Sequence, residues 1–185
     1  ELGSYRMIAQ LGRGGMGEVW RAEHRMLARP AAIKLIREEN LREADPERRR
    51  IALARFQREA QDTASLTSPH TVQVFDFGLD AAGAFYYVME LLDGVDLQTV
   101  VRENGAQPVE RVVHLLRQAC ESLAEAHVRG FVHRDIKPAN LMTCRLGGRH
   151  DFVKVLDFGL VHGGAASERA DAAGDAPLTV DGAIL

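Results

Sequence analysis

Three glycines near the start of the chain, Gly12, Gly14 and Gly17, follow the spacing G-x-G-x-x-G. This spacing is typical of dinucleotide-binding folds, where it leads into a helix, and of hairpins whose backbone amides cover phosphate groups. Residues 18–20 are typical of a strand, so the glycines are predicted to form the tip of a β-hairpin. Because the spacing alone favours an ordinary glycine-rich turn, the rest of the sequence must decide.

A lysine and a glutamate supply a second set of chemical groups. Ala32 and Lys34 point to the same face of a predicted strand, so a small side chain that leaves room for a flat ring lies beside an ammonium group that can reach phosphate oxygens. Glu59 lies near the apolar face of a predicted helix, where an unpaired carboxylate would be costly. We therefore expect Glu59 to pair with Lys34.

The densest group of polar residues lies in residues 133–140 (HRDIKPAN) and 157–159 (DFG). Asn140 precedes one short predicted strand and Asp157 follows the next, so antiparallel pairing brings their oxygen atoms together. Amide and carboxylate oxygens are ligands that Mg²⁺ accepts alongside substrate phosphates. Asp135, on the same loop, lies within reach of a hydroxyl group presented to the terminal phosphate.

Short strands must position most of these groups. Strands are predicted over residues 5–11, 18–22, 30–36, 71–77 and 84–90, and residues 141–143 and 152–156 are predicted to form a hairpin around residues 147–148.

Two helices complete the predicted elements. One begins at residues 45–47 and ends near Leu66. Its predicted apolar face holds Ile51, Phe56, Ala60 and Thr63. The other spans residues 109–127, because apolar side chains recur there at helical spacing. These side chains are Val109, Val112, Val113, Leu116, Ala119, Cys120, Leu123 and Ala126.

The composition of the chain excludes several classes of protein. Its 185 residues are 46% hydrophobic and 26% charged, which excludes global disorder and fits one globular domain or two small lobes. The net charge of −3 gives no reason to expect binding to nucleic acid or anionic lipid. The sequence contains no apolar run long enough to span a membrane and no secretory signal, and Cys120 and Cys144 are expected to be free thiols, so a cytoplasmic location is predicted.

In their order along the chain, these motifs resemble the eukaryotic-like (Hanks-type) serine/threonine protein kinases of bacteria. The matching motifs are G-x-G-x-x-G-x-V at residues 12–19, A-I-K ending at Lys34, Glu59, H-R-D-x-K-P-x-N at residues 133–140 and D-F-G at residues 157–159. The resemblance implies an α+β, two-lobe fold. Its N-lobe would be an antiparallel sheet with one helix over residues 1–92, and residues 93–185 would form a partial, mainly helical C-lobe.

The resemblance also implies ATP-dependent phosphoryl transfer to serine and threonine hydroxyl groups of proteins. The implied catalytic residues are Asp135, Lys137, Lys34 and Glu59. The implied ATP contacts are Leu11, Gly12, Gly14, Gly17, Val19, Ala32, Lys34, Met89, Glu90, Leu92, Asp96 and Met142. Asn140 and Asp157 would hold Mg²⁺, with Mn²⁺ as an alternative. Arg134 would pair with a phosphorylated activation loop, for which Thr179 is the candidate site.

Other interpretations remain at this stage. The chain reaches Leu185 without an A-P-E motif, so we expect a kinase fragment that lacks the rest of the C-lobe and leaves the helix at 109–127 partly uncovered. A nucleotide-binding pseudokinase or scaffold is opposed by the intact Lys34, Asp135, Asn140 and Asp157. A small-molecule phosphotransferase of the kinase fold is opposed by the complete glycine loop and by Lys137 followed by proline. The expected partners are ATP, protein substrates and a second copy of the chain for trans-autophosphorylation.

Overall fold

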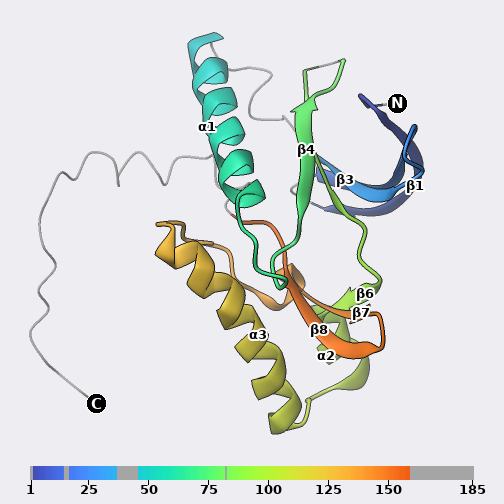
Figure 1. The fold of residues 1–185 in the computed structure, drawn as a ribbon, viewed down its shortest axis with the longest axis vertical. Helices are drawn as coiled ribbons and strands as arrows, with labels where there is room; N and C mark the ends of the chain where they lie inside the picture. The colour runs from blue at the N-terminus through green and yellow to red at the C-terminus, as the bar shows by residue number, and fades with distance from the viewer. Residues whose placement is uncertain (1, 15–16, 37–45, 82, 159–185) are drawn as a thin grey trace, which may run out of the picture.

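The N-terminal half of the chain forms a five-stranded antiparallel sheet with one helix beside it (Figure 1). The computed structural model describes residues 2–14, 17–36, 46–81 and 83–158. The strands, in the spatial order β1-β2-β3-β5-β4, are β1 (Tyr5–Gly14), β2 (Gly17–His24), β3 (Pro30–Ile36), β4 (Val74–Leu79) and β5 (Phe85–Glu90). The helix α1 (Pro46–Ala64) contacts β4. All five predicted strands are confirmed, although β4 begins at Val74 and not at residue 71.

The two faces of this sheet bury different sets of side chains. Ala32, Tyr87 and Met89 pack with Ala60 of α1 on one face. The other face buries Leu2, Tyr5, Ala22, Ala31, Ile33, Tyr86 and Val88. Because side chains alternate along a strand, Lys34 lies on the same face as Ala32, as predicted.

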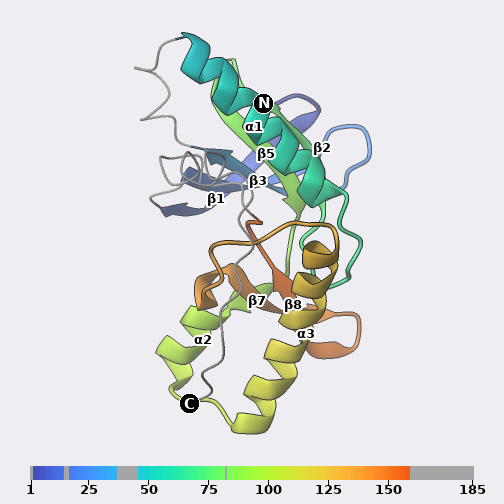
Figure 2. The same cartoon turned by 90° about the vertical axis from the view of Figure 1, so that its left-hand side faces the viewer.

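The second half of the described chain combines helices with a smaller sheet (Figure 2). Its elements are β6 (Gly94–Asp96), α2 (Leu97–Asn104), α3 (Val109–Val128), a 3₁₀ turn (Pro138–Asn140), β7 (Leu141–Leu146) and β8 (Arg149–Val155). The sheet has the order β6-β7-β8, and Leu141 pairs with Val155. The predicted hairpin is therefore confirmed, whereas β6 and α2 were not predicted. Within the described residues, no helix is long and apolar enough to cross a bilayer.

The helix α3 ends close to the predicted residue but buries a different face. Its buried side chains are Leu115, Gln118, Ala119, Ser122 and Ala126. Of the predicted stripe, Ala119 and Ala126 are buried, but Val109, Val112, Val113, Leu116 and Cys120 are exposed. The exposure of these five side chains agrees with the expectation that this helix is partly uncovered, while polar side chains that bond to the adjacent sheet and loop share the buried face.

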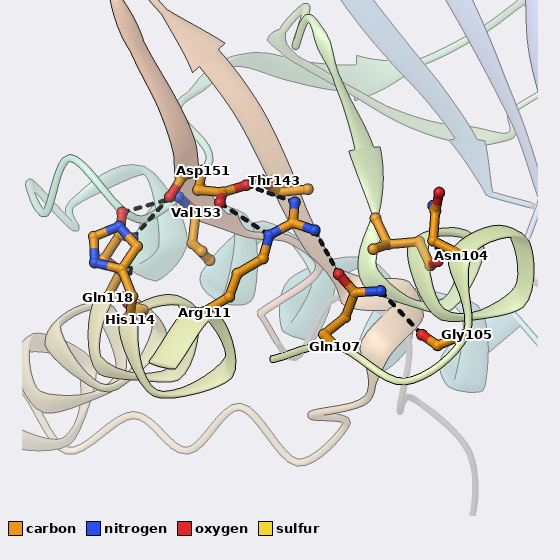
Figure 3. Close-up of polar contacts among 10 residues, drawn as sticks. Asn104, Gly105, Gln107, Arg111, His114, Gln118, Thr143, Asp151 and Val153 are labelled. Atoms are coloured by element: carbon orange, nitrogen blue, oxygen red, sulfur yellow. Dashed lines mark hydrogen bonds and ion pairs between the residues drawn. The ribbon is translucent and has the colours of Figure 1, made fainter. Parts of the chain in front are cut away.

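Gln118 shows how a polar side chain can occupy that face (Figure 3). Its Nε2 donates to the Asp151 carbonyl at 2.8 Å, and its Oε1 accepts from the Val153 amide at 3.0 Å. One turn further, the Ser122 hydroxyl bonds the Thr71 hydroxyl at 2.7 Å. Both polar groups are satisfied, so their burial carries little penalty.

In α1, the predicted apolar face is confirmed only toward the C-terminal end. Ala60 and Thr63 are buried, whereas Ile51 is 58% exposed. The side chain of Phe56 lies outside the described residues. The N-terminal turns of α1 extend past the packed core, so no apolar side chain among the described residues covers Ile51.

An ion pair fixes the β7–β8 hairpin against α3 (Figure 3). Arg111 donates from Nε and NH2 to the two carboxylate oxygens of Asp151, at 2.9 and 2.7 Å. Its NH1 donates to Gln107 at 2.5 Å. The hydrogen bond from Arg111 holds the pKa of Asp151 below its usual range. The strands that lead from Asn140 and into Asp157 are thereby held relative to α3.

Glu125 of α3 binds the loop that follows α1. Its carboxylate accepts from the Thr67 amide at 2.9 Å, the Thr67 hydroxyl at 2.8 Å and the Ser68 amide at 2.6 Å. Arg129 adds an ion pair at 2.9 Å. Burial would raise the pKa of Glu125, but these hydrogen bonds and Arg129 outweigh it, so the pKa lies below its usual value. The carboxylate therefore stabilises the fold when it is ionised.

Replacing Glu125 by glutamine should destabilise the chain, because one acceptor oxygen becomes an amide donor that faces other donors. We expect Glu125→Gln to lower the Tm by roughly 3–10 °C at neutral pH. Since the pKa is depressed in the folded state, this contribution should be lost as the pH falls through the folded-state pKa. The measurement is thermal unfolding followed by circular dichroism.

Glu121→Gln on the same helix is the matched control. Within the described residues, Glu121 makes two ion-pair contacts, each of 3.5 Å, to His70 and Arg117, so its replacement should change the Tm little. An equal loss of Tm in the two variants would contradict the role given to Glu125.

Candidate functional site

A cavity of about 770 Å³ separates the five-stranded sheet from the second half of the chain. The predicted site residues that line it are Leu11, Gly12, Gly17, Val19, Ala32, Lys34, Met89, Glu90, Leu92, Asp96, Lys137, Asn140, Met142 and Asp157. Residues that the sequence did not single out complete the lining: Arg13, Leu91, Gly94, Val95, Ala139 and Leu156. The structure thus brings together residues from β1, β2, β3, the segment after β5 and both ends of the β7–β8 hairpin.

One end of the cavity is apolar and shaped by short side chains. Ala32 on β3 lies opposite Met89 on β5, and Val19 on β2 is adjacent to β3 at Lys34. Met142 closes the other side from β7. A flat apolar ring fits between these groups because Ala32 fills little of the space.

The glycine segment forms the tip of a hairpin, as predicted. Gly14 pairs with Gly17 across the end of β1 and β2. A Cβ atom at Gly17 would lie 1.9 Å from the Leu35 carbonyl oxygen, and its φ of +140° is one that other residues rarely adopt. Gly17 therefore cannot be replaced without moving β3. Gly14 closes the hairpin through its pairing with Gly17.

Lys34 forms an ion pair at the polar end of the cavity. Its Nζ lies 2.5 Å from Oδ2 of Asp157, and the two side chains are 7% and 13% exposed. The hydroxyl of Tyr87 donates to the other carboxylate oxygen of Asp157. The side chain of Glu59, on α1, lies outside the described residues, so its pairing with Lys34 stays a prediction.

Asn140 precedes β7 and Asp157 follows β8, so both lie at the open end of the β7–β8 hairpin, as their order in the chain predicted. Leu141 pairs with Val155, and the Leu156 amide donates to the Asn140 carbonyl at 2.9 Å. Nδ2 of Asn140 donates to Asp135, which leaves its amide oxygen as an acceptor. An amide oxygen and a carboxylate that line the same cavity are a donor set that fits Mg²⁺.

Asp135 lies beside this pair. Its Oδ2 accepts from Lys137 Nζ at 2.7 Å and from Asn140 Nδ2 at 3.0 Å. Its carbonyl oxygen accepts a second bond from Asn140 at 2.9 Å. The preceding residue, Arg134, is exposed and has a φ of +64°, a backbone conformation in which non-glycine residues are uncommon.

His133 fixes this loop through hydrogen bonds to Asp135 and Leu156. It is 1% exposed, its Nε2 donates to the Leu156 carbonyl at 2.7 Å, and its Nδ1 accepts from the Asp135 amide at 3.3 Å. Its ring lies 4.7 Å from the ring of Phe158, measured between centroids. Burial lowers the pKa of His133, although the bond to Leu156 opposes the shift. A neutral imidazole satisfies both of these hydrogen bonds.

A second ion pair connects the end of β5 with β8. Nζ of Lys154 lies 2.6 Å from Oε1 of Glu90, which also accepts from the Gln73 amide at 2.9 Å. Lys154 additionally donates to the Thr71 carbonyl at 3.3 Å. The Glu90 carboxylate is thereby held by β8 and by residues 71–73, while Glu90 still lines the cavity.

Some predicted site residues are not brought to the cavity, and others were missed. Arg134 and Asp135 do not line it, and Thr179 lies outside the described residues. Sequence reasoning missed Tyr87, Lys154 and the packing of Phe158. Only Phe158 carried a sequence signal, since it lies within the D-F-G motif.

The antiparallel sheet with one helix, joined across a cavity to a mainly helical half, is the two-lobed protein-kinase fold. The family model described as protein kinase domain matches residues 5–175, so the chain belongs to this family. Members of the family use ATP and a divalent metal ion.

The relatives found are bacterial serine/threonine-protein kinases. Serine/threonine-protein kinase pkn3 of Myxococcus xanthus is 39% identical over 84% of this chain and 27% of its own length. Serine/threonine-protein kinase PknD of Mycobacterium tuberculosis is 36% identical over the whole chain and 25% of its own length. A crystal structure of the Mycobacterium tuberculosis PknI kinase domain matches with a TM-score of 0.73 and 29% identity, covering 95% of this chain and 68% of that one. The chain thus spans about a quarter of the length of the two curated relatives.

The neutral state of His133 should make stability fall in mild acid. In the unfolded chain, His133 binds a proton as the pH falls through about 6.5, whereas in the folded chain its lowered pKa keeps the ring neutral. The free energy of unfolding should therefore decrease as the pH drops below about 6.5. An NMR titration of the His133 ring should give a pKa below 6.5, and the Tm of His133→Phe should depend less on pH between about pH 5 and 6.5. A His133 pKa at or above 6.5 would refute this assignment.

Proposed function

We propose that the protein transfers the terminal phosphoryl group of ATP to serine or threonine hydroxyl groups of other proteins. The observation that carries the proposal is the grouping of Lys34, Asn140 and Asp157 at one end of a cavity whose other end fits a flat ring. Asp135 lies one hydrogen bond away from this group. The names of the relatives support the same activity and the choice of serine or threonine.

The lining residues would bind ATP in a fixed orientation. Val19, Ala32 and Met142 would hold the adenine ring, with Met89 behind it. The backbone of Glu90 and Leu92 would offer hydrogen bonds to the ring edge, and Asp96 would contact the ribose. The hairpin tip from Leu11 through Gly12 and Gly14 to Gly17 would cover the phosphates with backbone amides, and Lys34, held by Glu59, would bind their oxygens.

A divalent cation would be held by Asn140 and Asp157. Mg²⁺ fits these hard oxygen donors, and Mn²⁺ accepts the same donor set. When bound, the cation neutralises charge that develops on the phosphate oxygens. Lys34 would then turn from Asp157 toward the phosphate oxygens, because the cation would compensate the charge of the Asp157 carboxylate in its place.

Asp135 would orient the hydroxyl group of the protein substrate. Its carboxylate is fixed by Lys137 and Asn140, so it presents a defined acceptor to the incoming hydroxyl. Because phosphoryl transfer is largely dissociative, the proton moves late and the main contribution of Asp135 is position. Lys137 would approach the transferred phosphate and offset its charge.

In this proposal, residues 1–92 form the N-lobe and residues 93–185 belong to the C-lobe. We place the activity in the cytoplasm, where ATP is abundant. The thiols of Cys120 and Cys144 are free, as expected for a reducing compartment. Burial raises the pKa of Cys144 to about 11, so its thiol stays protonated.

Transfer of labelled phosphate from ATP to a generic basic protein tests the activity. Asp135→Asn and Asp157→Asn should each lower the rate by at least about 100-fold, because the first loses the carboxylate that takes up the proton of the substrate hydroxyl and the second loses a charged metal ligand. Asp62→Asn on α1, away from the cavity, is the matched control and should retain the wild-type rate. Equal rates in all four proteins would reject the assignment.

We further propose that Thr179 is phosphorylated by a second copy of the chain and that its phosphate pairs with the exposed Arg134. Mass-spectrometric mapping after incubation with Mg·ATP should find phosphate on Thr179 of the wild type and of an inactive Asp135→Asn chain mixed with it. An unmodified Thr179 in active protein would reject this site, and modification of the wild type alone would show that the reaction occurs within one molecule.

A further inference from the structure

The carboxylate of Asp157 is held by two strands of the sheet, although Asp157 itself follows β8. Lys34 of β3 pairs with Oδ2, and the hydroxyl of Tyr87 on β5 donates to Oδ1. Asp157 has a φ of +57°, which a non-glycine residue rarely adopts without outside contacts to hold it. Both side-chain contacts that fix it come from the five-stranded sheet.

The Tyr87 hydroxyl has no packing role that a phenylalanine would not fulfil. Tyr87 is 1% exposed, and its ring packs in a cluster with Ala32, Phe85 and Met89. A hydroxyl group buried among such side chains is costly unless it forms a hydrogen bond, and its described partner is Asp157. A tyrosine hydroxyl is protonated at neutral pH, so it acts as the donor in this bond.

We propose that Tyr87 is a positioning residue that orients Asp157 as a metal ligand, an inference that rests on the metal-binding role proposed for Asp157. A carboxylate has about four lone-pair positions, so one bond from Tyr87 leaves others for a cation. When Lys34 turns to the phosphates, Tyr87 remains the group that keeps the carboxylate facing the cavity. Hydrogen bonds of this kind to metal ligands commonly change metal affinity 10- to 100-fold.

The direct test is Mn²⁺ binding, measured by electron paramagnetic resonance in the presence of a non-hydrolysable ATP analogue. We expect Tyr87→Phe to weaken Mn²⁺ binding by about tenfold or more. Tyr86→Phe is the matched control: Tyr86 is the adjacent buried residue and packs on the opposite face of the sheet. Its replacement should leave the Mn²⁺ affinity within about twofold of the wild type.

Kinetics provide a second readout that a purely structural defect would not imitate. In Tyr87→Phe the KM for Mg²⁺ should rise about tenfold, while kcat at saturating Mg²⁺ recovers most of the wild-type value. In an Asp157→Asn background, Tyr87→Phe should cause no further loss of Mn²⁺ affinity, because the group through which it acts is gone.

A measurement on the unsubstituted protein covers the case in which Tyr87→Phe does not fold. The chain has three tyrosines, so 3-fluorotyrosine labelling gives three ¹⁹F resonances. Mg²⁺ and nucleotide should shift the Tyr87 resonance and leave those of Tyr5 and Tyr86 in place. The inference about Tyr87 would be overturned, and the proposed function left standing, by either of two results. One is a Tyr87 resonance that does not shift, and the other is an Mn²⁺ affinity in Tyr87→Phe that equals or exceeds that of the wild type. Absence of Mn²⁺ binding by the wild type would overturn the proposed function as well.

Discussion

The polar end of the cavity depends on one carboxylate, that of Asp157. Asp157 leaves the smaller sheet after β8, and its two oxygens are bound from the larger sheet by Lys34 and Tyr87. The contact is buried on both sides, so any change in the distance between the two halves of the molecule must break it or move Asp157. The ion pair therefore couples the spacing of the two lobes to the geometry of the site.

Much of the candidate site could be predicted from the sequence, because short motifs carry their own backbone geometry. The glycine spacing followed by a strand predicts a hairpin tip, and Gly17 confirms it through its contact with Leu35. Antiparallel pairing brings Asn140 and Leu156 together with no need to know the rest of the fold. Tyr87 and Lys154 could not be found in this way, since their partners lie 70 and 64 residues away in sequence. From the sequence alone, a tyrosine on a strand indicates ordinary packing, and a lysine on a strand indicates a solvated side chain.

The fold was predictable where the apolar residues of an element are also its buried residues. It was not predictable where polar side chains are buried in place of apolar ones. The five strands lie where they were predicted, and β3 matches its predicted range. On α3 the burial of the polar Gln118 and Ser122 was not predicted, whereas the exposed valines of the same helix agree with the expectation that it is partly uncovered. The short helix α2 was missed, although Asp96 caps it through a 2.8 Å bond to the Thr99 amide, a signal that the sequence does contain.

The hydrogen bonds of Gln118 have a consequence for the β8 edge of the smaller sheet. In the described chain, β8 is the last strand of that sheet, and a bare edge of amides and carbonyls can pair with a strand of another molecule. The Gln118 amide offers β8 one donor and one acceptor, at Asp151 and Val153, as a neighbouring strand would. Further along, His70 and Val72 bond Val155 through their backbones. A single side chain and a short segment thus occupy the hydrogen-bonding groups of this edge, which protects the hairpin that carries Asn140 and Asp157 from unwanted strand pairing.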